Sequence, residues 1–233
     1  IDEALALFMD ARLIVAHDTG PEPIYTIDSE RRIALEYYQN TIIHFFVPRA
    51  LIAAGLLVDK EEWVDVARLN DRVQQLSRLF KHEFIFRTDA TFGEIFDDTL
   101  QGMAADGEVE LRDGHAQATE GLARTRLERY AVMLQTFFES YLLALRGAEI
   151  VLDGPIPKKD WYKRTLALGQ QMYLAGEIER RESLSKLKLE TALKALQDYR
   201  LVQLNEDILE RGDGVESVAD LHALEPKLTG FLR

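Results

Sequence analysis

The 233-residue chain contains no cysteine, which excludes disulfide bonds and zinc sites built on thiolates. Basic residues are also few relative to acidic ones. There are 28 lysines and arginines against 40 aspartates and glutamates, and the net charge is −12. A chain this acidic lacks the basic footprint of a duplex-binding protein and offers no polybasic anchor for anionic lipid. We therefore expect no nucleic-acid partner.

Common catalytic and cofactor motifs are missing as well. The sequence has no P-loop, no GxGxxG, no GxSxG and no HExxH or His-x₃-His pair, so we expect neither a metal nor a cofactor. The acidic turn Glu210–Ser217 lacks the full EF-hand pattern, and we interpret it as a solvated loop rather than a calcium site. No signal peptide is visible, and the chain does not begin with Met. We expect it to be a soluble fragment of a longer protein.

The longest apolar run extends from Tyr37 to Val58 and is long enough to span a bilayer. However, Arg49 lies near its centre, where a charge is costly in hydrocarbon, and Pro48 would kink a helix there. Asn40 and His44 add further polar groups to the same run. We interpret the run as a helix buried in a globular core. The alternative is a helix that lies on a membrane surface.

Helical periodicity dominates the rest of the chain. Apolar residues that recur at three- and four-residue steps predict helices over 1–12, 63–80, 92–103, 127–145, 161–176 and 182–199. Gly107 is expected to be the C′ residue that ends one of them. Ser29, or Asp28 in its place, is the expected N-cap of the helix that carries the apolar run.

Short strands are predicted between these helices. Residues 12–16 and 23–28 form one candidate pair, and Asp113-Gly114 marks a hairpin turn within 108–119. A second strand pair could open at 200–207. A helix followed by a two-stranded wing suggests a winged-helix-like unit. The sequence thus predicts a mainly α fold with small β-hairpins and winged-helix-like units, in one domain over 1–233.

The segment "YYQNTIIHFFVPRALIA" resembles part of the bacterial membrane-associated glycerol-3-phosphate 1-O-acyltransferases. In that family a Tyr-Tyr-x-Asn-x-x-x-His element precedes an apolar run downstream of the catalytic domain. Gln39 and Thr41 replace the basic residue and the second Asn that are common there. The matching residues, with the arginine that follows them, are our candidates for structural or interdomain contacts: Tyr37, Tyr38, Asn40, His44 and Arg49.

The resemblance continues in ordered segments over about residues 10–205. It implies the C-terminal helical region of an enzyme that moves an acyl group from acyl-CoA or acyl-carrier protein to glycerol 3-phosphate, the first step of phospholipid synthesis. It also implies two partners, an upstream acyltransferase domain and, through the full-length protein, the cytoplasmic face of the inner membrane.

The family's catalytic element, His-x₄-Asp, is absent from this chain. The fifth residue after each histidine is Glu22, Arg49, Arg87, Glu120 or Lys227. We therefore expect no catalytic residue here. Two alternatives are a stand-alone helical protein-interaction module and a winged-helix transcription factor. The acidic balance disfavours the second, despite local basic residues at Lys186, Lys188 and Lys194.

Overall fold

The computed structural model describes residues 2–18, 20, 23–27, 31–32, 35, 42–58, 62–86 and 89–231. Contacts divide the chain into two compact units, an N-terminal unit over Ile1–Phe45 and a main unit over Phe46–Arg233. Each is described by itself below. The single domain over 1–233 stays a prediction.

The N-terminal unit begins with helix α1 (Asp2–Asp10) and an antiparallel hairpin of β1 (Val15–His17) and β2 (Ile24–Thr26). The predicted helix and strand pair are confirmed. His17 ends β1, and its Nε2 lies 2.7 Å from Thr26 Oγ1 across the hairpin. The N-cap candidates Asp28 and Ser29 lie outside the described residues.

The apolar run does not form one continuous helix. A 3₁₀ turn, η1 (Ile43–Phe45), is followed by a separate helix, α3 (Val47–Leu57). Pro48 lies in the first turn of α3, where its missing N–H would have had no helical partner, so the predicted kink was wrong. Most of α3 is buried. Within the part of the chain that the structure describes, no helix is long and apolar enough to cross a membrane.

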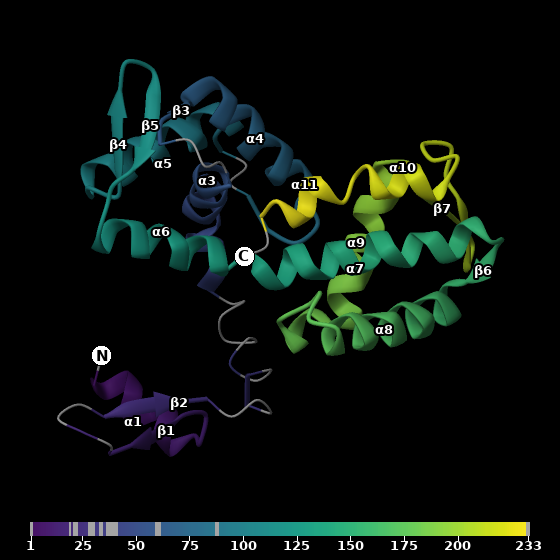
Figure 1. Cartoon of the computed structure of the whole chain (residues 1–233), viewed down its shortest axis with the longest axis horizontal. Coiled ribbons are helices and arrows are strands. Elements are labelled where there is room, and N and C mark those ends of the chain that lie inside the picture. Colours follow the sequence, from purple (N-terminus) through teal and green to yellow (C-terminus); the bar gives the residue numbers. More distant parts are fainter. Residues whose placement is uncertain are drawn as a thin grey trace. The chain divides into compact units, whose positions relative to one another are not determined.

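The first module, residues 47–118, is a winged helix. After α3 come β3 (Val64–Asp65), α4 (Val66–Leu79), α5 (Phe92–Ala105), β4 (Val109–Arg112) and β5 (His115–Ala118), and the sheet order is β3-β5-β4. Figure 1 shows β4 and β5 standing out beside α5 as the wing. A two-residue turn joins these strands, and φ is 49° at Asp113 and 77° at Gly114, as a primed hairpin turn requires. The predicted hairpin is confirmed.

The second module, residues 135–211, repeats this topology. Its elements are α7 (Gln135–Leu152), β6 (Ile156–Pro157), α8 (Lys158–Leu174), the 3₁₀ turn η2 (Arg181–Ser183), α9 (Lys186–Asp198), β7 (Val202–Asn205) and β8 (Ile208–Arg211). The sheet order is β6-β8-β7, the same as in the first module. The second strand pair predicted from 200–207 is thereby confirmed.

Helix α6 (Leu122–Val132) connects the modules and packs on α3. We predicted one helix over 127–145, and this was wrong because the chain leaves the helix before α7 begins. The amide of Leu134 bonds the carbonyl of Ala131, three residues back, at 3.0 Å. Leu134 is fully buried, so the break is a packed joint and not a frayed end.

Backbone hydrogen bonds recur at equivalent positions of the two modules. The first amide of α4, on Val66, donates to the carbonyl of Gly114 at 2.9 Å. The first amide of α8, on Lys158, donates to the carbonyl of Asp207 at 2.7 Å. In both cases the tip of the wing holds the start of the helix that follows the short strand. The register is therefore repeated as well as the topology.

An aromatic cluster joins the modules. Phe80 and Phe84, in the turn after α4, meet Phe137, Phe138 and Tyr141 on α7. Ring centroids lie 4.9–6.4 Å apart with steep interplanar angles, which is the favoured edge-to-face geometry. The turn that links α4 to α5 is thus fixed on the central helix of the second module.

A short tail follows the second module, with α10 (Val218–His222) and α11 (Pro226–Thr229) packed on α7. Figure 1 shows both tail helices running alongside α7. Phe231 stacks on Phe138 with ring centroids 5.0 Å apart. A capping box at Ser217 starts α10, and His222 ends it.

Candidate functional site

Arg49 connects α3 to the segment between α5 and β4 and, through Glu108, to α6. From α3, its Nη2 donates to Asp106 Oδ2 at 2.7 Å and its Nη1 to Glu108 Oε2 at 2.9 Å. The hydroxyl of Tyr130, on α6, donates to the other oxygen of Glu108 at 3.2 Å. Glu108 is only 2% exposed, so its carboxylate depends on these partners. Arg49 is therefore a structural tie within the main unit.

The charge state of Arg49 follows from the same contacts. Burial alone lowers its pKa, but the hydrogen bond to Asp106, the contact with Tyr130 and the charge of Glu108 outweigh burial and raise it. The guanidinium stays charged, as a double carboxylate partner requires.

The other candidates from the family element are placed only in part. His44 lies on η1 in the N-terminal unit and is half-buried. Tyr37, Tyr38 and Asn40 lie outside the described residues. A structural or interdomain role for these four residues thus stays a prediction.

Glu139 is the most deeply buried carboxylate that accepts several hydrogen bonds among the described residues. It lies on α7, is 1% exposed and accepts from the amides of Glu179 and Arg180, both at 3.0 Å. Ser183 Oγ donates to it at 2.6 Å and Gln135 Nε2 at 3.2 Å. These bonds fix the turn between α8 and α9. The sequence signal was a single acidic residue on an otherwise apolar helix face, which does not reveal such distant partners.

Glu83 forms a polar link between the modules. The hydroxyl of Thr191, on α9, donates to its carboxylate. Burial raises the pKa of Glu83 to about 7, although the Thr191 hydrogen bond and the charge of Lys188 lower it. Nearby Tyr141 has a raised pKa, first because it is buried and second because of the charge of Glu83. Glu83 therefore titrates near neutral pH inside the junction.

His82 and Lys81 form an ionic contact beside this junction. Both meet Asp198 Oδ2 at the end of α9, His82 Nε2 at 2.6 Å and Lys81 Nζ at 2.8 Å. Burial raises the pKa of Asp198, but the hydrogen bonds from Lys81 and His82 outweigh it and lower the pKa overall. His82 thus joins the turn after α4 to α9.

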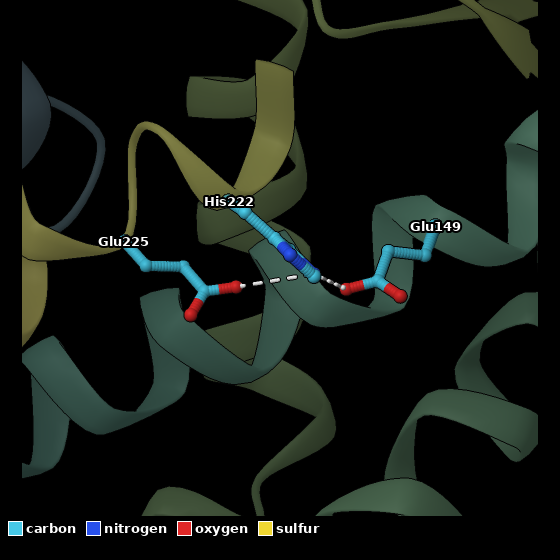
Figure 2. A group of neighbouring side chains, drawn as sticks. All are labelled: Glu149, His222 and Glu225. Carbon is cyan, nitrogen blue, oxygen red and sulfur yellow. Dashed lines mark hydrogen bonds and ion pairs between the residues drawn. The ribbon is translucent and has the colours of Figure 1, made fainter. Parts of the chain in front are cut away.

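Among the described residues, one set of three side chains could ligate a metal ion: Glu149, His222 and Glu225. His222 Nε2 lies 3.1 Å from Glu149 Oε1 and 3.7 Å from Glu225 Oε1, and the three ligand atoms are within 4.8 Å of one another. Figure 2 shows the imidazole between the two carboxylates. Arg146 Nη2 pairs with Glu225 at 2.9 Å and Nη1 lies 3.7 Å from Glu149.

This group, which we call the α7–tail cluster, is best explained without a metal. The guanidinium of Arg146 contacts both carboxylates, and its positive charge opposes a cation in the same place. The cluster fastens α10 and α11 to α7. The sequence did not reveal it because Glu149 is far from the other two residues along the chain.

Two carboxylates of the acidic loop over 210–217 lie in contacts with other side chains. Asp213 pairs with Arg200, and Glu210 accepts a hydrogen bond from Asn205 at 2.8 Å. Asp220 accepts from the amides of Glu216 and Ser217 as a helix cap. The solvated loop remains our interpretation of this segment.

The family model for the glycerol-3-phosphate acyltransferase C-terminal region matches residues 1–205. That range includes the N-terminal unit, the first module and most of the second, and it stops before β8, α10 and α11. The matched range agrees closely with residues 10–205, over which ordered segments of the sequence resemble the family.

Individual relatives agree with the family model. A protein of Mycobacterium tuberculosis that carries the name acyltransferase plsB1 is 23% identical over 194 residues, which cover 82% of this chain and 31% of the relative. A glycerol-3-phosphate acyltransferase of Colwellia psychrerythraea is 22% identical over 178 residues, 74% of this chain and 21% of the relative. The chain thus spans less than a third of the length of these relatives. It belongs to the glycerol-3-phosphate acyltransferase family and corresponds to the C-terminal region of its members.

Proposed function

We propose that this chain is a non-catalytic region that supports the catalytic domain of a glycerol-3-phosphate acyltransferase. The whole protein would transfer an acyl group from acyl-CoA or acyl-carrier protein to glycerol 3-phosphate. Its partners would be the upstream acyltransferase domain and, as a peripheral contact, the cytoplasmic face of the inner membrane. The family membership supports the reaction class.

The non-catalytic assignment rests on the histidines. Acyl transfer to a hydroxyl needs a positioned base, and no histidine here is followed five residues later by Asp. Histidine side chains also make structural contacts. These contacts join His17 to Thr26, His82 to Asp198, His115 to the carbonyl of Asp113, and His222 to Glu149.

The alternative is a stand-alone protein-interaction module, and the repeated winged-helix topology favours it. DNA is a poor partner for such a pair. Helix α5 holds the position of a recognition helix, yet it carries Glu94, Asp97 and Asp98 and no basic residue. In α9, Lys188 is only 5% exposed and donates to the carbonyl of Glu182, so it adds nothing to a basic face.

Activity measurements separate these functions. Radiolabelled glycerol 3-phosphate and palmitoyl-CoA would be supplied with phospholipid, once to this chain and once to the full-length protein that contains it. We expect turnover only from the full-length protein. A full-length variant with alanine at the histidine of its His-x₄-Asp element is the control for background and should be inactive.

Turnover by the chain alone would contradict the non-catalytic assignment. An inactive full-length protein would instead favour the interaction module. Membrane association is tested separately, by flotation of the full-length protein with vesicles that contain anionic phospholipid. A full-length protein that stays unbound would remove the membrane surface from its partners.

A further inference from the structure

A cavity of about 620 Å³ opens where α4 of the first module faces α7, α9 and α11. Apolar side chains form much of its wall, among them Leu76, Leu79, Leu145, Leu196, Leu228 and Phe231. This volume lies within the range of sites that hold small organic ligands. An apolar chain would gain burial free energy along such a wall.

The charged side chains that line this cavity are positive, whereas the chain as a whole is negative. The described lining residues include Arg72, Arg78 and Lys227 and no aspartate or glutamate, although the chain carries a net charge of −12. Arg72 donates to the carbonyl of Gly55. Arg78 and Lys227 are exposed, and no carboxylate in the described part of the chain pairs with either. Two cations are therefore available at an apolar cavity.

The phenol of Tyr199 adds a polar group to the same lining. Burial and the charge of Asp198 raise its pKa, whereas the charges of Arg78 and Lys81 act in the opposite direction. The guanidinium of Arg78 is thus close enough to the phenol to influence it. Arg78, Tyr199 and Lys227 together offer charged and neutral hydrogen-bond donors, the combination that suits a carboxylate or phosphate group.

We propose that this cavity binds a single-chain anionic amphiphile, with its hydrocarbon chain against the leucines and its carboxylate or phosphate group at Arg78 and Lys227. A purely apolar ligand would leave the cations unused, and a small anion would leave the apolar wall exposed. The proposal does not depend on the proposed function. Part of the cavity wall comes from α11, which lies beyond the residues matched by the family model.

Isothermal titration calorimetry of the 233-residue chain tests the proposal with ligands that share one chain length. Laurate, dodecyl phosphate and dodecyltrimethylammonium would each be titrated below their micelle concentrations. We expect one-to-one binding of the two anions and no such binding of the cation. This order is diagnostic because the net charge of −12 favours the cation in any non-specific association.

Variants locate the site. Arg78→Gln and Lys227→Gln should each weaken binding of both anions about ten-fold, since each removes one charge-assisted contact. Both side chains are exposed, so the fold should not change. Lys163→Gln is the matched control, because Lys163 is an exposed cation on α8 away from the cavity, and binding should not change.

Equal binding of the cation, no binding of either anion, or unchanged binding by both cavity variants would overturn the proposal. If only one of the two anions binds, or binds more tightly, the result identifies the head group as carboxylate or phosphate. Either preference supports the site, provided that Arg78→Gln and Lys227→Gln weaken it.

Discussion

At the end of the helix that precedes the wing, the first module has Gly107 and the second has Arg200. Both residues adopt positive φ, 70° and 59°. Both helices end in the Schellman pattern, in which the residue after this position bonds the carbonyl five residues back, at 2.9 Å in each module. Those bonds run from Glu108 to Met103 and from Leu201 to Leu196. Backbone geometry is thus retained where the side chain is not.

The turns between the two central helices differ more. In the first module Phe80 and Phe84 pack against rings of α7. In the second module the carboxylate of Glu139, also on α7, holds the turn by hydrogen bonds to the amides of Glu179 and Arg180. One helix therefore fixes both turns, the first by apolar contact and the second by a buried charge.

Replacing Glu139 should have the largest effect on this comparison. Glu139→Ala leaves two part-buried amides and the buried hydroxyl of Ser183 without their acceptor, and we expect a loss of about 4 kcal/mol in the free energy of unfolding. Urea denaturation followed by circular dichroism measures it. Glu139→Gln should lose less, because one acceptor oxygen remains.

Glu128→Ala is the matched control, since Glu128 is an exposed glutamate on α6 and its removal should change stability by less than about 0.5 kcal/mol. If Glu139→Ala were as mild as this control, the second turn would not depend on the buried carboxylate. The contrast between the two turns would then be lost.

The pH dependence of stability tests the junction at Glu83. Its pKa is about 7 in the folded chain against an ordinary value of 4.5, so the folded state binds more protons between these values. Stability should therefore fall as pH rises from about 4.5 to 7, by up to about 3 kcal/mol. Urea midpoints across this range, for the wild type and Glu83→Gln, measure it. Glu83→Gln lacks the titrating group, so its stability should fall less over this pH range. Parallel stability curves for the wild type and the variant would contradict this prediction.

The smallest effects are expected at the helix ends. Gly107→Ala places a side chain at φ 70° and should cost about 1 kcal/mol. Arg200→Gly relieves the same strain. However, it removes an exposed ion pair with Asp213 and increases the conformational entropy of the unfolded chain. The net change in stability should therefore stay within about 0.5 kcal/mol. Thermal denaturation compares them. A larger cost for Arg200→Gly would show that the side chain itself holds the second wing.

Sequence patterns were sufficient where the signal is local. The Asp113-Gly114 turn and the glycine at 107 each act within a few residues, and both were placed correctly. The third strand of each sheet was missed because Val64–Asp65 and Ile156–Pro157 are too short to show alternation. The joint at Leu134 was missed because its apolar residues continue the helical stripe across the break.

Long-range polar contacts could not be inferred in the same way. Arg49 was recognised as a candidate, but its partners Asp106 and Glu108 are distant in sequence and carry no sign of that pairing. The same holds for Glu139 with the turn after α8 and for His222 with Glu149. Such pairs are set by the topology, which brings the end of one element to the face of another.

The aromatic cluster that joins the turn after α4 to helix α7 affects how the main unit unfolds. Phe80 is fully buried there, and Phe137, Phe138 and Tyr141 lie on a helix that also forms the core of the second module. Opening one module would strip these rings of partners that belong to the other. The two winged helices should therefore unfold as one cooperative transition, with equal calorimetric and van't Hoff enthalpies, although each has its own sheet.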